Sequence, residues 1–246
     1  MPKVGADPLA PDPTRRTPVT PEARPLDARL PDAVFWDMDG TLLDTEPLWE
    51  KVLVEFAERL GTEMTSALRD STMGNSSVDA MTKVYEAALV PEAGRDFEGD
   101  EEWMVQRVLE QFAGGPPWRP GAIDALDLVA AADIPMVLVT NTMREVTDVL
   151  LETIGRERFV TTVCGDEVEA GKPEPHIYRR AAELVGAPTH RCLAIEDSPA
   201  GAAATFAAGV RAIIVPSAIE VQPRATYTYR DSLVGLTLDD LAAALA

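Results

Sequence analysis

Two aspartates separated by one residue, Asp37 and Asp39, follow a short apolar run and are followed at once by Gly40. One carboxylate in such a pair can attack as a nucleophile and bind a metal ion, while its neighbour donates and accepts protons. The glycine frees the backbone to turn directly after the pair. An Asp-Gly sequence is also common in ordinary surface turns, so the pair alone leaves both interpretations open.

Three further segments carry reactive or ligating side chains at or just after apolar runs or before a helix. Thr140 and Asn141 offer a hydroxyl and an amide, which are short donors for phosphate oxygens. Lys172 supplies a cation just before a helix that starts with proline. Glu196 and Asp197 are adjacent acids whose oxygens suit Mg²⁺. Each also has a structural explanation, as a helix cap, a solvated lysine or helix-start charges, but four coincidences favour one shared site.

The elements that must position these residues form an alternating pattern from Ala33 onward. Short β-branched or apolar runs alternate with helical stretches, which predicts an α/β fold with a Rossmann-like parallel sheet and helices on both faces. Ligands of such open sheets bind at the carboxyl ends of the strands, where most of the polar residues above are found. The predicted strands are 33–37, 135–140, 160–164, 192–197 and 210–215, and the predicted core helices are 121–131, 144–154, 175–185, 199–208 and 238–245.

The interval between the first two predicted strands is much longer than a simple crossover requires. It has helical spacing at 47–60, 77–90 and 99–112. We therefore predict an inserted α-helical cap domain at 47–115 and an α/β core domain at 31–46 and 116–246. Residues 1–30 are rich in proline and lack an apolar period, which predicts a disordered N-terminal extension.

The charge balance restricts the partners of the protein. The formal net charge is −19, from 41 acidic and 22 basic residues, and so negative a surface repels nucleic-acid backbones and anionic lipid. No apolar stretch approaches the roughly 20 residues needed to cross a bilayer, and no secretory signal is evident. We expect a cytoplasmic protein with no nucleic-acid, membrane or obligate protein partner. A small anionic substrate would need local positive charge, from a metal ion, a lysine or helix N-termini.

The order and spacing of the four segments resembles the haloacid dehalogenase superfamily. The similarity lies in DMDGT at 37–41, the strand end at Thr140, GKPEP at 171–175 and EDSPAG at 196–201, and it spans nearly all of 33–216. The resemblance implies that Asp37 is the nucleophile and that Asp39 is the general acid and base. The predicted helical insert is similar to the cap of the phosphoglycolate phosphatase and β-phosphoglucomutase branch.

The same resemblance implies two sets of ligands. The residues that would bind the transferring phosphate are Thr140, Asn141 and Lys172. The groups that would bind Mg²⁺ are the side chains of Asp37, Glu196 and Asp197 together with the backbone carbonyl of Asp39. The implied activity is a Mg²⁺-dependent phosphatase that hydrolyses a small phosphorylated metabolite, a sugar or polyol phosphate, through an aspartyl phosphate.

The sequence leaves three alternatives to this phosphatase. A dehalogenase of the superfamily resembles this chain less, because that branch carries a different residue where Asp39 stands. A sugar phosphomutase needs both acids, but the mutase pattern has a histidine where this chain has Trp49, and an indole cannot shuttle protons. A non-catalytic phospho-acceptor module would need neither the cap nor Asp39. Trp49 itself is expected to belong to the hydrophobic core, not to the site.

A weaker similarity concerns the predicted cap. The segments 44–49 and 72–74 resemble sugar-phosphate and polyol-phosphate phosphatases of the same branch. Where those relatives place an arginine, this chain has Asn75, Ser76 and Ser77. Their amide and hydroxyl groups would suit a polyol better than a second phosphate. The alternative, equally open from the sequence, is that this segment only caps the next helix.

Overall fold

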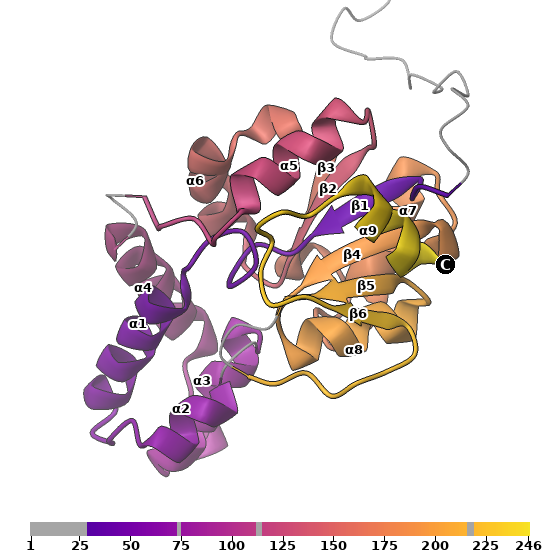
Figure 1. Ribbon diagram of the computed structural model, residues 1–246. Helices are drawn as coiled ribbons and strands as arrows, with labels where there is room; N and C mark the ends of the chain where they lie inside the picture. The colour runs from indigo at the N-terminus through magenta and orange to yellow at the C-terminus, as the bar shows by residue number, and fades with distance from the viewer. Residues whose placement is uncertain (1–28, 73–74, 112–114, 216–218) are drawn as a thin grey trace, which may run out of the picture.

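A six-stranded parallel sheet forms the centre of the protein (Figure 1). The computed structural model describes residues 29–72, 75–111, 115–215 and 219–246, so the predicted N-terminal extension lies almost wholly outside the described residues. The strand order is β3-β2-β1-β4-β5-β6, and β1 therefore lies between β2 and β4. The strands are β1 (Ala33–Trp36), β2 (Met136–Thr140), β3 (Thr161–Cys164), β4 (Cys192–Glu196), β5 (Arg211–Ile214) and β6 (Tyr227–Tyr229).

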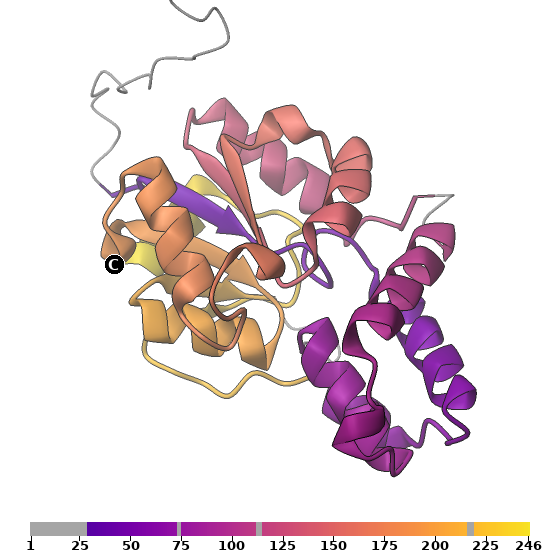
Figure 2. The same ribbon diagram turned by 180° about the vertical axis from the view of Figure 1, so that it is seen from behind.

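Helices cover both faces of the sheet, because the central strands are apolar on both sides. Along β1, Val34 and Trp36 pack into one hydrophobic cluster, and Ala33 and Phe35 pack into the other. The first cluster includes side chains of α5 (Ala122–Ala131), α6 (Arg144–Ile154) and α9 (Leu238–Leu245). The second includes those of α7 (His176–Val185) and α8 (Pro199–Ala208). Figures 1 and 2 show these two layers from opposite sides.

A bundle of helices lies beyond the carboxyl ends of the strands (Figures 1 and 2). Its own core includes Phe56 and Tyr85, whose rings meet edge to face at 5.5 Å, and the Tyr85 hydroxyl donates to the buried Asp100 carboxylate at 2.5 Å. The bundle is inserted between β1 and β2, and it consists of α1 (Glu46–Arg59), α2 (Ser66–Thr72), α3 (Ser77–Ala87) and α4 (Phe97–Gln111).

The predicted fold class is confirmed, since the sheet is parallel and covered on both faces, with a helical insert after β1. Among the described strands and α-helices, the short helix α2 and the edge strand β6, which has only three residues, were not predicted. The division of the chain at 47 and 115 stays a prediction. Cys164 and Cys192 are buried free thiols. In the described parts of the chain, no helix combines the length and apolarity needed to span a membrane.

Candidate active site

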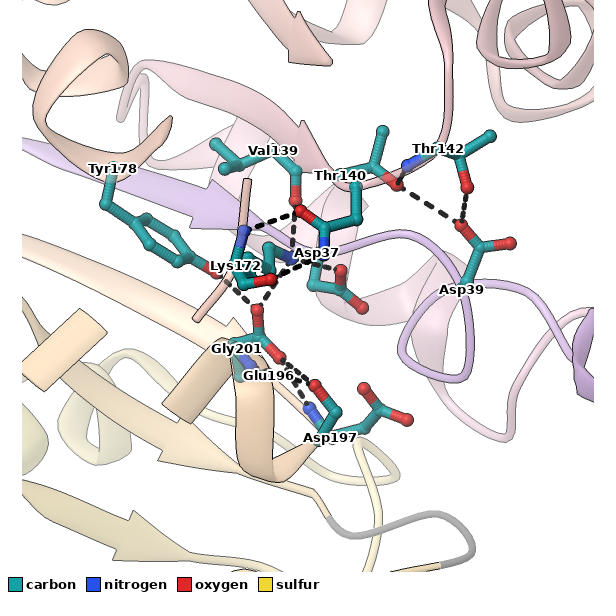
Figure 3. Close-up of polar contacts among 12 residues, drawn as sticks. Asp37, Asp39, Val139, Thr140, Thr142, Lys172, Tyr178, Glu196, Asp197 and Gly201 are labelled. Carbon is teal, nitrogen blue, oxygen red and sulfur yellow. Dashed lines mark hydrogen bonds and ion pairs between the residues drawn. The ribbon is translucent and has the colours of Figure 1, made fainter. Parts of the chain in front are cut away.

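The strand order reverses at β1, and this reversal brings the predicted site residues together. The next strand along the chain, β2, pairs with one edge of β1, whereas β4 pairs with the other. In open parallel sheets such a switch point leaves a crevice at the carboxyl ends of the strands. Asp37, Thr140 and Glu196 end or follow these three adjacent strands. Figure 3 shows their side chains converging with Lys172, which comes from the loop before α7.

Lys172 is the centre of the buried polar cluster. Its Nζ lies 2.5 Å from Asp37 Oδ1, 2.7 Å from Glu196 Oε1 and 2.9 Å from the Val139 carbonyl oxygen. Only 4% of the residue is exposed. Burial alone would lower the pKa of Lys172, but the Asp37 and Glu196 carboxylates outweigh burial and hold the pKa above its usual range. The ammonium is therefore charged and uses all three of its protons.

Glu196 is completely buried, and both of its carboxylate oxygens accept hydrogen bonds. Oε1 accepts from the Tyr178 hydroxyl at 2.5 Å as well as from Lys172 (Figure 3). Oε2 accepts from the Asp197 backbone N–H at 3.2 Å and from the Ser198 hydroxyl at 3.4 Å. Burial raises the pKa of the Tyr178 hydroxyl well above its ordinary value, so this group remains a donor.

Asp37 carries the one carboxylate oxygen in this cluster that is buried without a hydrogen-bond partner, Oδ2. Burial raises the pKa of the Asp37 carboxyl to about 7, although the Lys172 ammonium opposes the shift. Ligand oxygens of Asp37, Glu196 and Asp197 all lie within 4.8 Å of one another. Three carboxylates that offer oxygens so close together are the ligands that a hard divalent cation prefers, so this donor set fits such an ion. Such a cation would favour the ionised form of Asp37.

Asp39 is held by four donors, of which Figure 3 shows Thr140 and Thr142. Its Oδ1 accepts from the Thr45 hydroxyl at 2.6 Å and from the Trp49 indole N–H at 3.2 Å. Its Oδ2 accepts from the hydroxyls of Thr142 at 2.7 Å and Thr140 at 3.2 Å. Donors from the insert and from the core sheet therefore fix the same carboxylate.

Thr45, Trp49, Thr142 and Tyr178 were not identified from the sequence. Trp49 was assigned to the core, and its ring does pack there, but its N–H reaches Asp39. Trp49 follows Thr45 by four positions on one helical face, a spacing that could have indicated a shared contact. No pattern marks Thr142 or Tyr178, because their partners are distant in the sequence.

Asn141 is used to hold the loop of Lys172. Its Oδ1 accepts from the Lys172 backbone N–H at 2.7 Å, and its Nδ2 donates to the Lys172 carbonyl at 3.0 Å. A Cβ at Gly171 would lie 2.5 Å from Asn141 Oδ1, so only glycine allows this approach. The structure thus gives the Asn141 side chain a positioning role, and its predicted contact with phosphate stays a prediction.

A cavity of about 320 Å³ lies between this cluster and the insert. Asp37, Asp39 and Lys172 form part of its core side. The insert contributes Trp49, Leu53, Arg69, Asn75, Ser76 and Ser77. Ser76 also caps α3, because its hydroxyl accepts from the Asp79 backbone N–H at 3.2 Å. The capping alternative thus holds for Ser76, which lines the cavity as well.

The parallel sheet, the capped crevice and the buried aspartate–lysine cluster define a Rossmann-like α/β protein with a helical insert over its candidate site. Residues 31–209 match the family model described as haloacid dehalogenase-like hydrolase. The chain belongs to this family. The predicted superfamily is thereby confirmed.

Characterised relatives place the chain more closely among phosphatases. It is 31% identical to the phosphorylated carbohydrates phosphatase of Thermotoga maritima, over 74% of this chain and 83% of that protein. It is 28% identical to hexitol phosphatase B of Escherichia coli strain K12, over 85% of this chain and 96% of that protein. The prediction of a phosphatase-type enzyme of this superfamily is confirmed by these relatives.

The fold comparison agrees with this placement. CbbY from Rhodobacter sphaeroides in complex with phosphate superposes with a TM-score of 0.77 at 26% identity, covering 86% of this chain and 99% of that one. A mutant CbbY in complex with xylulose-(1,5)bisphosphate gives the same TM-score at 25% identity, with the same share of each chain covered.

Gly201→Ala tests the packing around Glu196. A Cβ at this position would lie 1.9–2.0 Å from the Glu196 carboxylate, which is buried and bonded on both oxygens. Overpacking of this kind costs about 1–3 kcal/mol of stability. We expect kcat/KM for p-nitrophenyl phosphate to fall by about 100-fold, because displaced reacting groups lose their alignment. Urea unfolding and steady-state kinetics measure the two effects.

Gly209→Ala is the matched control, at the C-cap of the same helix. Its left-handed backbone, with φ +73°, makes a side chain cost about 1–2 kcal/mol, but the added Cβ meets only Thr189 Oγ1 at 3.5 Å. We expect a similar loss of stability with normal turnover. Equal activity in the two variants would contradict the importance of the Glu196 packing.

Proposed function

We propose that the protein is a Mg²⁺-dependent phosphatase of small sugar or polyol monophosphates and that it forms an aspartyl phosphate on Asp37. The observation that carries the proposal is the buried contact of Lys172 with Asp37, whose second oxygen is unpartnered in a residue that lines the cavity. A nucleophile needs a fixed orientation and an oxygen that no donor occupies. Lys172 supplies the orientation through Oδ1, and Oδ2 accepts no hydrogen bond.

The metal site is the acidic side of the same cluster. We propose that Asp37, Glu196, Asp197 and the Asp39 backbone carbonyl hold Mg²⁺. When bound, the ion would neutralise charge on the phosphate oxygens and allow the anionic ester to approach an anionic carboxylate. The grouping of the three carboxylates, whose ligand oxygens lie within 4.8 Å of one another, supports this assignment.

The chain's own residues then perform two displacements. An Asp37 oxygen attacks phosphorus while the bond to the substrate oxygen breaks, and Asp39 gives a proton to the departing alkoxide. Water next attacks the aspartyl phosphate, Asp39 takes the proton of that water, and inorganic phosphate leaves with Asp37 regenerated. Lys172 and Thr140 donate to the oxygens of the transferring group.

The charge of the cavity favours substrates with a single phosphate. Glu50 lines its insert side and is bound to Arg69 at 3.0 Å. A second phosphate could bind Arg69 only by displacing the Glu50 carboxylate. Sugar and polyol hydroxyls carry no such penalty. The phosphorylated-carbohydrate and hexitol phosphatases among the relatives support this substrate class.

A phosphomutase gains no support from the described residues. Such an enzyme must return the phosphoryl group to a sugar and must protect the aspartyl phosphate from water. Trp49, at the position of the mutase histidine, donates its N–H to Asp39, but an indole nitrogen neither releases nor accepts a proton near neutral pH. Hydrolysis is therefore the better supported activity.

Asp37→Asn should abolish turnover of p-nitrophenyl phosphate in the presence of Mg²⁺. The substitution removes the attacking charge with little change of volume, so kcat falls by about 10⁴-fold or more while thermal unfolding stays cooperative. Wild-type enzyme treated with a chelator should be equally inactive and should recover when Mg²⁺ is restored. Turnover retained by Asp37→Asn would refute the nucleophile. A folded wild-type protein with no turnover would indicate a non-catalytic phosphate-binding module.

Asp39→Asn should show a loss that depends on the leaving group. An alkyl phosphate needs a proton on its departing oxygen, so kcat falls by about 100- to 10,000-fold, whereas p-nitrophenolate leaves without one and loses much less. Single-turnover rates with both substrates measure the difference. Equal losses would contradict leaving-group protonation by Asp39.

Substrate charge can be tested with a panel of hexitol, hexose and glycerol monophosphates against hexose and xylulose bisphosphates. We expect kcat/KM to favour the monophosphates by about tenfold or more, because a second phosphate is repelled. Glu50→Gln should narrow this ratio by releasing Arg69. Glu58→Gln, an exposed change on the same helix, should leave the ratio unchanged. A preference of the wild type for bisphosphates would contradict this substrate class.

A further inference from the structure

We propose that Tyr178 is a positioning residue that frees Lys172 to bind the transferring phosphate, an inference that rests on the proposed function of Lys172. Tyr178 lies on α7, is fully buried and belongs to none of the four sequence motifs. Its hydroxyl donates to Glu196 Oε1 at 2.5 Å. Lys172 Nζ lies 5.5 Å from the centroid of its ring. Figure 3 shows that the hydroxyl and the ammonium reach the same carboxylate.

All three N–H groups of Lys172 already make hydrogen bonds in this arrangement. Its three N–H groups are directed to Asp37, Glu196 and the Val139 carbonyl. A phosphate oxygen can accept a hydrogen bond from Lys172 only if the ammonium breaks its hydrogen bond to one of these three acceptors. The acceptor that does so must remain satisfied by another donor, because a buried carboxylate or carbonyl without a partner is costly.

Glu196 Oε1 is the acceptor that meets this condition. Tyr178 already donates to the same oxygen, so Glu196 keeps a partner when Lys172 turns towards phosphate. Asp37 Oδ1 has no comparable second donor among its described hydrogen bonds. The hydroxyl of Tyr178 thus lowers the free-energy cost of redirecting one Lys172 N–H from Glu196 to a phosphate oxygen.

Phenylalanine at position 178 would preserve the packing and remove this function. The ring would still pack near Phe35, at a centroid distance of 6.2 Å, and near Lys172. Glu196 Oε1 would then depend on Lys172 alone and would hold the ammonium back from phosphate. Glu196 Oε2 would keep its donors Asp197 and Ser198, so the acidic side of the cluster would be unaltered.

The test measures phosphate and metal binding separately in Tyr178→Phe. Inorganic phosphate is titrated as a competitive inhibitor of p-nitrophenyl phosphate hydrolysis, and Mg²⁺ is titrated by calorimetry without substrate. We expect the inhibition constant of phosphate to rise about tenfold, the effect of one hydrogen bond to a charged group. We expect the Mg²⁺ dissociation constant to remain unchanged. If Tyr178 had a purely structural role, its substitution would weaken the binding of phosphate and of Mg²⁺ together.

Tyr85→Phe is the matched control, because the Tyr85 hydroxyl also donates to a buried carboxylate, that of Asp100, at 2.5 Å. This variant should lose comparable thermal stability with unchanged phosphate and Mg²⁺ constants. Suppose that the wild type hydrolyses the ester and is inhibited by phosphate. An unchanged inhibition constant of phosphate in Tyr178→Phe, or a parallel loss of Mg²⁺ affinity, would then overturn this inference but not the proposed function. A wild type that does neither would overturn the proposed function, and the inference with it.

Discussion

The structure of the site depends on one buried ion cluster, the ammonium of Lys172 between the carboxylates of Asp37 and Glu196. Charges removed from water are costly, and well-packed apolar residues would often serve stability equally well or better. Asp197 adds a third carboxylate, whose oxygen lies within 4.8 Å of those of Asp37 and Glu196. Such an arrangement is understandable as a site prepared for ligands that carry charge, a divalent cation on its acidic side and an anion beside the lysine.

The fold brings this cluster together by setting three strands side by side and leaving glycine where polar groups press on the backbone. Adjacent parallel strands end at one edge, so Asp37 and Glu196 arrive there from β1 and β4 without long loops. Gly171 and Gly201 admit the Asn141 amide and the Glu196 carboxylate at distances that any Cβ would block. Glycine is required at these two positions by the close approach of polar side chains and not by the geometry of a turn.

The sequence was sufficient for the parts of the fold and site that repeat local rules. Apolar runs that end in Asp37, Thr140 and Glu196 predicted the central strands and the edge where ligands bind, and the long interval after β1 predicted a helical insert. It was insufficient where a contact joins distant segments. Tyr178 meets Glu196 across 18 residues and Thr142 meets Asp39 across 103, and neither pairing has a local signal. Strand β6 and helix α2 were too short for periodicity to identify.

Asp39 links the chemistry to the insert through the same kind of long-range contact. Its four donors come from both sides of the cavity, with Trp49 on α1 and Thr142 beside the sheet. To reach a leaving oxygen near Asp37, the carboxylate must give up at least part of this set. Trp49 belongs to the insert, so a displacement of α1 relative to the sheet would change its contact with Asp39. Under the proposed role of Asp39, the position of the insert would therefore influence proton transfer as well as the shape of the cavity.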